Sequence, residues 1–427
     1  MFHKLLNKYA WDAPQSIKRD INYVIFLLFA GYLWILPIAH TTTIRESLFF
    51  SLLFTTLWAA WRKGLKLTLP LLTAWLIYGA VAGVSLFYAL DPVYSLKEIK
   101  NEIFYSMLVM LIAASWVRNE KALSKVIGLL IAGNVFLVCI GIIQVIHLQL
   151  SSPEKIVTAP LGIGVGKFST YIILVIPVII AQAVLSLKRN SFAAFSMFLL
   201  LCANLISLYF TINRAAWQSL VIEFVLIFFL LWYCRVLLFS PKILIGIGVI
   251  LSLLAIFFSF SSVIQRSAHI KNPNISISGK VYQSLSDDPR LDYWGAAIKN
   301  IAERPLSGGG FGRETFKMLN EVFYKTKSHG WHAHNMFLNK GVQMGIPGIV
   351  AFCVLLGAAL RKMWLIMKNG SANGASVIYA VAGIAMIAGM IIKNLTDDFF
   401  IRDLGWLFWL VTAAIIGAFR RGEQSRQ

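Results

Sequence analysis

The stretch Pro305-Leu306-Ser307-Gly308-Gly309-Gly310-Phe311-Gly312 lies in the only long polar segment of the chain, residues 263–345. The sequence on both sides of this segment is strongly hydrophobic. The segment also contains Pro289-Arg290-Leu291-Asp292-Tyr293-Trp294, a histidine cluster, and a second glycine motif, Gly345-Ile346-Pro347-Gly348. We therefore predict a membrane bundle that presents this segment to water on one side, and we expect the chemistry to be located there.

The composition predicts a polytopic helical membrane protein. Of the 427 residues, 58% are hydrophobic and only 14% are charged, whereas about 25% are charged in a typical soluble domain. The net charge of +20 does not indicate a nucleic-acid partner, because the basic residues lie mostly in short loops between apolar runs. The four cysteines lie inside apolar runs, which argues against both a disulfide framework and a thiolate metal site.

Apolar runs of membrane length predict about twelve transmembrane helices. The first run follows a basic amphipathic stretch and is interpreted as a retained span, not a cleaved signal peptide. The predicted fold is all-α, with one large helical loop outside the bundle. The predicted spans are roughly 21–40, 47–61, 69–90, 103–117, 126–148, 171–187, 192–211, 217–234, 243–262, 345–360, 376–395 and 404–418.

The distribution of lysine and arginine predicts the orientation. Alternate loops are rich in basic residues, and such loops stay in the cytoplasm. Both termini are therefore expected to be cytoplasmic, with the long polar loop on the outside. We divide the chain into a bundle of about nine helices (1–262), the outer loop with the motifs (263–344), and about three C-terminal helices (345–427).

The outer loop is predicted to contain two amphipathic helices that pack on each other or on the membrane surface. Asp288-Pro289 indicates a helix start, with Asp as N-cap and Pro in the first helical position, and Pro305 ends this helix. The glycines that follow favour a turn, which either lets two helices approach closely or seats a phosphate on its N–H groups. The predicted apolar positions are Leu291, Trp294, Ile298 and Ile301 in the first helix, and Phe316, Leu319 and Phe323 in the second.

Taken in their order along the chain, these motifs resemble those of the O-antigen ligase and polymerase superfamily. The resemblance rests on Arg290 with Trp294, the glycine stretch 305–312, and His334-Asn335 followed by nine residues and Gly345. The His-Asn to Gly spacing is similar to a motif of the ligase branch. Asn213-Arg214-Ala215 resembles the Ser-Arg-Gly element of the family, with Asn in place of Ser and Ala in place of Gly. The layout of spans also fits, so the resemblance covers nearly the whole chain.

The resemblance implies a multi-pass enzyme of the bacterial inner membrane with its active site facing the periplasm. The family transfers a glycan from undecaprenyl diphosphate. The acceptor is a sugar hydroxyl of lipid A–core in the ligase branch, and the end of another undecaprenyl-linked glycan in the polymerase branch. We interpret the chain as an O-antigen ligase, with polymerase as the alternative. Its expected partners are the lipid-linked glycan, lipid A–core and membrane lipids.

Such a transfer needs a base, and His334 is the candidate because imidazole titrates near neutrality. The motif favours His334 over His332, although His332 is a rival for this role. A histidine that caps the next helix and a metal site that also uses His329 are the alternatives. We disfavour the metal site because no carboxylate ligand is evident near the histidines.

The departing diphosphate needs positive charge, and Arg214 and Arg290 are the candidates because guanidinium groups bind phosphate oxygens bidentately. Solvated or topological charges are the alternative interpretation of both. We also predict substrate contacts from His332, Asn335, Trp294, Lys97 and Lys100. Asp397, Asp398 and Arg402 form another outer group, interpreted as a salt-bridged loop.

No Asp-x-Asp pair is present in the outer segments, since Asp287-Asp288 and Asp397-Asp398 are adjacent. We therefore predict a metal-independent transfer without a cofactor, in which arginine supplies the positive charge. Direct attack by the acceptor predicts inversion at the anomeric carbon. A transporter is the rival class, but transporters place ionisable residues near the bilayer midplane, and here the mid-span positions are almost purely apolar.

Overall fold

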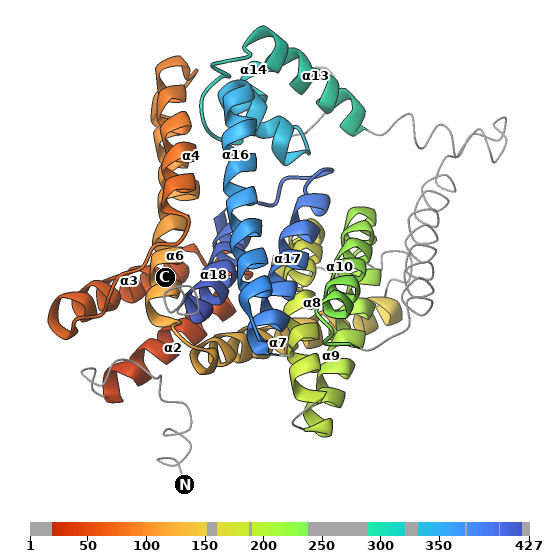
Figure 1. The fold of residues 1–427 in the computed structure, drawn as a ribbon. Helices are drawn as coiled ribbons and strands as arrows, with labels where there is room; N and C mark the ends of the chain where they lie inside the picture. The colour runs from red at the N-terminus through yellow and green to blue at the C-terminus, as the bar shows by residue number, and fades with distance from the viewer. Residues whose placement is uncertain are drawn as a thin grey trace, which may run out of the picture.

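The computed structural model describes residues 19–151, 160–187, 190–237, 289–320, 332–371, 374–400 and 402–420. Within these ranges all regular elements are helical, which confirms the all-α prediction (Figure 1). Three short elements differ from α-helix: η1 (Leu86–Tyr88) and η4 (Pro160–Gly162) are 3₁₀ turns, and η2 (Lys100–Phe104) is a π-helix. The α-helices are α2 (Arg19–Ile35), α3 (Thr42–Lys63), α4 (Leu72–Ser85), α5 (Pro92–Ile99), α6 (Tyr105–Trp116), α7 (Glu120–Ser151), α8 (Val165–Leu187), α9 (Ser191–Tyr209), α10 (Arg214–Tyr233), α13 (Pro289–Glu303), α14 (Thr315–Leu319), α16 (Met336–Asn369), α17 (Ala375–Lys393) and α18 (Arg402–Phe419).

Seven of these helices are long and apolar enough to cross a membrane, as expected of a polytopic membrane protein. They are α7 to α10 and α16 to α18, and two shorter apolar helices, Asn22–Ile35 and Leu72–Tyr88, accompany them. Each predicted span within the described residues coincides with a helix. The predicted span 243–262 lies outside the described residues. The total of twelve, the orientation and the division into three regions stay predictions.

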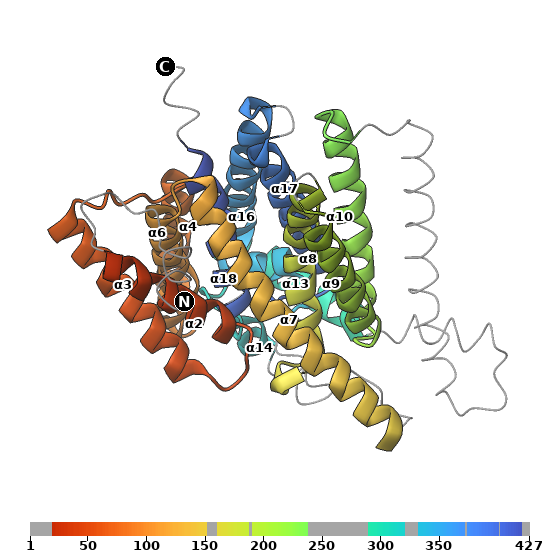
Figure 2. The same cartoon turned by 90° about the horizontal axis from the view of Figure 1, so that it is seen from below.

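The centre of the bundle is formed by α17 and α18, whose apolar windows are 78% and 83% buried. Helix α17 packs against α8, α10 and α16, while α18 packs mainly against α6. Helix α7 crosses the bundle obliquely between the α2/α3 pair and the group of α8, α9 and α10 (Figure 2). Helices α13 and α14 lie together at one end of the bundle, beside the start of α16 (Figure 1).

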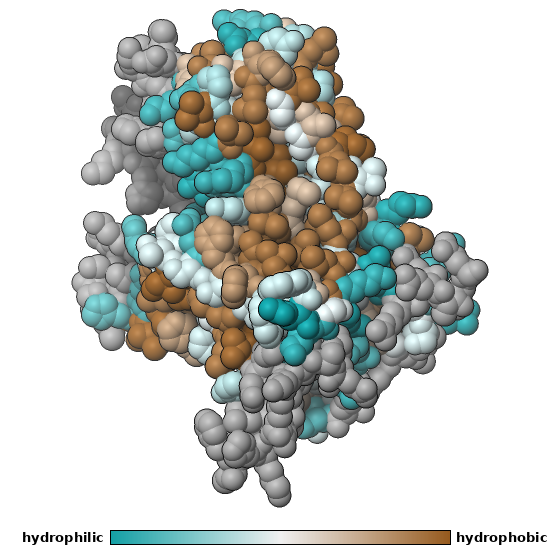
Figure 3. Space-filling model, turned by 90° about the vertical axis from the view of Figure 1, so that its left-hand side faces the viewer, coloured by the Kyte–Doolittle hydropathy of each residue, from teal (hydrophilic) through white to brown (hydrophobic). Residues whose placement is uncertain are grey.

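The outer surface of the bundle is apolar. Phe54 and Trp61 on α3 are 72% and 74% exposed, and α4 exposes Leu76 and Val84. Figure 3 shows a broad hydrophobic band on the side of the molecule that carries α3 and α4. A surface of this size is unfavourable in water and is typical of contact with lipid.

Mid-span positions are less uniformly apolar than we expected. Glu223 on α10 is completely buried, and a Cβ added to Gly389 on α17 would overlap its carboxyl group. Asn134 on α7 and Asn204 on α9 exchange two side-chain hydrogen bonds of 3.0 and 2.8 Å. Polar groups like these connect helices inside a membrane, where lipid offers no hydrogen-bond partner.

Helix α16 is broken at Gly345, whose φ of 66° and ψ of −165° interrupt the helical backbone. The glycine turn docks on this break. The N–H groups of Gly309 and Gly310 donate to the carbonyls of Val342 (2.9 Å) and Gln343 (3.0 Å), and Ile346 N–H donates to Pro305 (2.7 Å).

The glycines of this turn permit close backbone approach. Gly308 and Gly310 have φ of 61° and 106°, and a Cβ on Gly308 would overlap the backbone of Gln343. The N–H groups of residues 308–310 all donate to backbone carbonyls, since Gly308 N–H reaches Arg304 at 3.1 Å. These N–H groups are therefore occupied by backbone contacts. This favours the interpretation that the glycines permit close helix approach, and disfavours the interpretation that the turn binds a phosphate.

The first outer helix begins at Pro289 as predicted, although Asp288 lies outside the described residues. Its predicted apolar face is wrong in part: Leu291 and Ile298 are 54% and 58% exposed, whereas Trp294 and Ile301 are partly buried. The buried positions are Tyr293, Ala297 and Asn300. The small Ala297 lets α13 approach α16 closely, and the ring of Tyr293 fills the space toward α14. A prediction that places the largest aliphatic side chains inside therefore selects the wrong positions.

The two outer helices do pack on each other. Tyr293 of α13 meets Phe316 of α14 edge to face, with ring centroids 6.3 Å apart. Helix α14 is short and ends at Leu319, and Phe323 lies outside the described residues.

We predict that Gly345→Ala lowers the thermal unfolding temperature of the detergent-purified protein. A side chain at this φ and ψ is strained by about 1–3 kcal/mol, and its Cβ would overlap the Pro305 carbonyl. Gly357→Ala is the matched control on the same helix, because a Cβ there meets no atom within 4 Å. Unfolding monitored by tryptophan fluorescence measures both. Equal unfolding temperatures for the two variants would contradict the role of the break.

Candidate functional site

Three segments that are distant in the sequence meet where α16 begins. Met336 N–H donates to the carbonyl of Asn394 at 2.9 Å, and the Asn335 side chain donates to the carbonyl of Leu395 at 2.9 Å. The indole of Trp294, on α13, makes a long hydrogen bond of 3.4 Å to the carbonyl of His334. The residues that precede α16, those that follow α17 and helix α13 therefore form one site.

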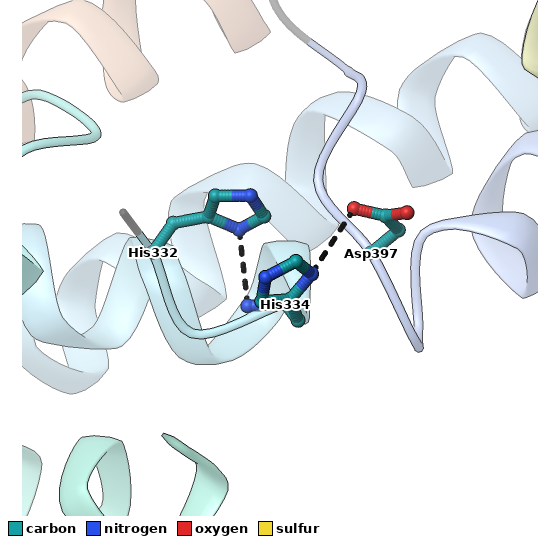
Figure 4. A group of neighbouring side chains, drawn as sticks. All are labelled: His332, His334 and Asp397. Carbon is teal, nitrogen blue, oxygen red and sulfur yellow. Dashed lines mark hydrogen bonds and ion pairs between the residues drawn. The ribbon is translucent and has the colours of Figure 1, made fainter. Parts of the chain in front are cut away.

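His334 lies at the centre of this site, between His332 and Asp397 (Figure 4). Its Nδ1 is 3.4 Å from Oδ1 of Asp397, within ion-pair distance. Its ring stacks on Tyr293 with centroids 5.5 Å apart, and its side chain is 28% exposed. A partly accessible imidazole beside a carboxylate is an arrangement that can accept a proton.

The backbone of His334 is held in the left-handed region, with a φ of 50°. Non-glycine residues adopt this conformation uncommonly, although histidine does so more often than most, and six other described non-glycine residues, His40 among them, share a positive φ. His334 N–H donates to Nδ1 of His332 at 3.0 Å, and Ala333 N–H donates to the side chain of Asn339 at 2.9 Å. These bonds, with the Trp294 indole, hold the strained residue in place.

Asn335 is the N-cap of α16, and its Oδ1 accepts the N–H groups of Phe337 (2.9 Å) and Leu338 (3.1 Å). Because its Nδ2 is bonded to Leu395, both ends of this amide serve the backbone. The structure thus gives Asn335 a local structural role, and its predicted contact with substrate stays a prediction. The helix-capping role that we considered for His334 belongs to Asn335.

His332 differs from His334 in its surroundings. It is only 6% exposed, and Nη2 of Arg313 contacts its Nε2. Burial, together with the positive charge of Arg313, lowers the pKa of His332 well below its ordinary value. A neutral ring can accept the His334 N–H, so His332 supports the backbone of His334, and the base role of His334 stays a prediction.

Asp397 is held in its charged form. Burial by itself would raise its pKa, but the nearby imidazole of His334 and the positive charge of Lys393 outweigh burial, so the pKa lies below its ordinary range. Nζ of the fully buried Lys393 is 3.8 Å from Oδ2 of Asp397. An ionised carboxylate beside Nδ1 favours the tautomer that leaves Nε2 free to accept a proton.

The predicted salt-bridged group of Asp397, Asp398 and Arg402 is wrong as a unit, since each residue pairs elsewhere. Asp398 interacts with Arg313 (4.0 Å) and with the Asn339 side chain. Arg402 binds Glu98 at 2.7 Å. These partners lie far apart in the chain, so only the tertiary packing, including that of α5 against the start of α18, could identify them.

Several functional candidates were not selected from the sequence. Arg313, Asn339 and Lys393 were missed, and the partnership of Asp397 with His334 was not foreseen. Arg313 directly follows the glycine motif, and Asn339 lies one helical turn after Asn335; these two spacings were the available signals. For Lys393, the only indication in the sequence is that a lysine at the end of an apolar helix is costly to bury.

Arg290 reaches the site from α13. It is half-buried in the first turn and lies close enough to Lys393 for its charge to act on that residue. Trp294, one turn later, holds the His334 carbonyl. The structure thus brings Arg290, Trp294, His332, His334 and Asn335 together.

Arg214 is the first residue of α10, which packs along α17, the helix that ends at Lys393. Asn213 caps α10 by accepting the N–H of Ala216 at 3.2 Å. Asn in place of the family's Ser therefore preserves the cap.

Lys97 and Lys100 are exposed and lie on α5 and η2. Their helix neighbours Glu98 and Glu102 pair with Arg402 and Lys340, respectively. Their surroundings are therefore distinct from the histidine site. His329 lies outside the described residues.

The site contains a carboxylate that we did not expect beside the histidines. Ligand atoms of His332, His334 and Asp397 all lie within 4.8 Å of one another, so the set could in principle hold a metal ion. However, Arg313 contacts His332, and Lys393 lies 3.8 Å from Asp397. The positive charges of Arg313 and Lys393 would repel a divalent ion at this position. The three residues are therefore better suited to a histidine paired with a carboxylate than to a metal centre.

We predict that folding stability falls as the pH drops from 7.5 to 5.5. Folded His332 stays neutral, whereas an unfolded histidine takes up a proton below a pH of about 6.5, so the unfolded state binds more protons. Asp397 adds a further loss below a pH of about 4, because its folded pKa is depressed. Thermal unfolding at stepped pH measures both effects.

His332→Asn is the diagnostic variant, because an amide oxygen can still accept the His334 N–H but does not titrate. We expect a shallower pH dependence above pH 5.5, while the exposed control His40→Asn keeps the wild-type dependence. An unchanged slope in His332→Asn would contradict the neutral buried ring.

Comparison with known proteins gives one family. Residues 195–353 match the family model described as O-antigen ligase. This range contains Arg214, Arg290 and His334, while Asp397 and Lys393 lie beyond it. No curated protein matches the chain. The superfamily covers O-antigen ligases and polymerases, and the match over residues 195–353 supports the resemblance of this chain to that superfamily.

Proposed function

We propose that the chain is an inner-membrane glycosyltransferase of lipopolysaccharide biosynthesis, most specifically an O-antigen ligase. It would transfer glycan from undecaprenyl diphosphate to a sugar hydroxyl of lipid A–core at the periplasmic face. The observation that carries the proposal is the pairing of His334 with Asp397, beside Arg290 and in a chain with the family match. O-antigen polymerase is the alternative, since the same site could serve a lipid-linked glycan acceptor.

The proposed reaction is a single displacement. Nε2 of His334 accepts the proton of the acceptor hydroxyl as its oxygen bonds to the anomeric carbon. The bond from that carbon to the diphosphate oxygen breaks at the same time, and undecaprenyl diphosphate leaves with the electron pair. The proton on His334 then passes to solvent or to the leaving diphosphate. One displacement inverts the anomeric carbon.

Asp397 supports this step because its negative charge stabilises the imidazolium that forms. Its distance of 3.4 Å from Nδ1 is compatible with a bond that tightens when substrate binds. Arg290 and Arg214 would bind the diphosphate and stabilise the charge that develops on it. In this proposal the arginines supply what a divalent cation provides in other enzymes, and no cofactor is needed.

The transporter alternative gains one observation, the buried Glu223 in the middle of α10. The other ionisable groups described above cluster at the end of the bundle where α13 and α14 lie, which favours surface chemistry. We therefore keep transport as an outcome of the assay below.

The assay uses purified protein, an undecaprenyl-diphosphate-linked glycan and EDTA throughout, with and without lipid A–core. We expect a slower lipid A–core band on a gel only when both substrates are present. Longer polyprenyl-linked chains without lipid A–core would identify a polymerase. Activity that is lost in EDTA and restored by Mg²⁺ would contradict metal independence. Folded protein that forms no product under any condition would favour transport.

We predict that His334→Ala lowers the turnover number about 100- to 10,000-fold, the usual contribution of a positioned base. Asp397→Asn should lower turnover with little change in the KM for donor, because it removes the charge that orients and stabilises the imidazole. His40→Asn is the control for histidine loss outside the site. Full activity of His334→Ala would refute the base assignment.

We predict a different kinetic pattern for the arginines. Arg290→Gln and Arg214→Gln should raise the KM for the diphosphate donor and lower turnover, because the lost charge acts on both bound donor and leaving group. Arg290→Lys should restore only part of the activity, since an ammonium cannot bind two phosphate oxygens in a fork. The control is Arg62→Gln, because Arg62 lies on α3, away from the motif residues. An unchanged donor KM in both Gln variants would contradict diphosphate binding.

A further inference from the structure

Helix α5 has an inverted distribution of side chains. Its inward positions are polar, with Ser95 1% and Glu98 3% exposed. Its outward positions include Val93 and Leu96, which are 80% and 58% exposed. A helix on the surface of a water-soluble protein shows the reverse pattern.

The outward stripe changes from apolar to basic along the helix. The exposed residues Val93, Leu96, Lys97 and Lys100 follow the spacing i, i+3, i+4 and i+7, which places them on one face. The preceding turn adds Phe87 and Tyr88, which are 86% and 58% exposed. We call these six residues the α4–α5 tip.

The inward stripe fixes which face points outward. Glu98 binds Arg402 at 2.7 Å, and Glu102 binds the buried Lys340 at 2.9 Å. Within the π-helix η2, the carbonyl of Asn101 accepts the Trp406 indole N–H at 3.0 Å. Rotation of the helix would break these buried pairs at high cost, so the tip cannot turn its apolar side chains inward.

The position of the tip relative to the bilayer follows from helix length. The backbone is helical from residue 92 to residue 116 without interruption. A hydrocarbon core of about 30 Å corresponds to about 20 helical residues. Counted from Trp116, beyond which Arg118 and Lys121 follow, this length ends near Leu96 and Lys97. The tip therefore lies at the level of the lipid head groups on the side of the histidine site.

We propose that the α4–α5 tip is a docking surface for anionic phospholipids of the adjacent leaflet. Lys97 and Lys100 would bind head-group phosphates, and each lysine near a charged lipid surface contributes about 1 kcal/mol. By the same count Lys100 lies about one helical turn inside this level and Val93 about one turn outside it. The side chains of Lys97 and Lys100 would extend toward the start of the helix, and so toward the phosphates, while Phe87 and Val93 would lie among the head groups. Exposed apolar side chains and unburied lysines on one face at the membrane boundary are complementary to this partner, and an aqueous protein surface would not need the apolar part.

The tip is connected directly to the segment that supports the proposed active site. Leu90 N–H donates to the carbonyl of Gly309 at 2.9 Å, and Glu314 N–H donates to the Tyr94 hydroxyl at 2.9 Å. A Cβ on Gly312 would lie 2.5 Å from the Tyr94 ring. Lipid bound at the tip would therefore stabilise residues 305–316, which include Arg313 beside His332.

The first experiment compares purified protein in nanodiscs of phosphatidylcholine alone and with increasing phosphatidylglycerol, without any substrate. We expect phosphatidylglycerol to raise the unfolding temperature and to slow amide hydrogen exchange in residues 86–104 and 305–316. In Lys97→Gln/Lys100→Gln, the phosphatidylglycerol fraction for half of this effect should rise about 30-fold, the factor that corresponds to two lysines at about 1 kcal/mol each.

Lys299→Gln is the matched control, because it removes an exposed lysine on α13 outside the tip. It should keep the wild-type response. The same response in the double variant as in wild type would overturn the proposal. Protection of 86–104 that appears only when the lipid substrates are added would also overturn it, since the partner would then be a substrate.

The second experiment measures depth independently of charge. A nitroxide spin label is attached at Val93→Cys, or at Lys299→Cys for comparison, after the four native cysteines are replaced. We expect the label at position 93 to collide more with oxygen, and the label at position 299 more with a water-soluble nickel chelate. Nickel accessibility at position 93 equal to that at position 299 would place the tip in water and refute lipid docking.

Discussion

The break of α16 at Gly345 is the constraint on which the rest of the outer end depends. It frees Ile346 N–H to bind the Pro305 carbonyl, and it leaves the carbonyls of Val342 and Gln343 to accept the glycine turn. Two motifs separated in the chain are thereby joined backbone to backbone. Backbone hydrogen bonds need no particular side chain. The two motifs must therefore supply small residues at fixed spacing, which explains why glycine occurs in both.

The second organising factor is charge in a low-dielectric setting. Glu102, Asp397 and Asp403 each face a cation, namely Lys340, Lys393 and Arg45, because an unpaired buried charge is costly. At the histidine site this pairing does more than stabilise. It keeps Asp397 ionised beside His334, while Arg313 disfavours protonation of His332. Two histidines two residues apart thus receive different chemical properties from their surroundings.

These arrangements suit a transferase that works at a membrane surface. The proposed base His334, Asp397 and Arg290 are held by α13, by the residues before α16 and by the residues after α17, all helical elements or their ends. The left-handed backbone of His334 is maintained by hydrogen bonds with Trp294 of α13 and with the neighbouring His332. The glycine turn links this site to the α4–α5 tip, so the same backbone contacts hold the tip and the surroundings of His334 together.

The sequence by itself determined the helical class, the positions of the apolar helices, the start of α13 at Pro289 and the choice of His334, Arg290 and Trp294 as neighbours in one site. The length of a hydrophobic run and the conformational preferences of proline and glycine are local properties, so the sequence alone specifies the helices. The order of the motifs along the chain identified the site residues. Only the tertiary structure decided that Asp397 pairs with His334, that Arg402 pairs with Glu98, and that α13 buries Tyr293 and Ala297 rather than Leu291 and Ile298. Partners separated by tens to hundreds of residues are selected by helix packing, and a residue's charge or size alone does not specify which distant helix it will meet.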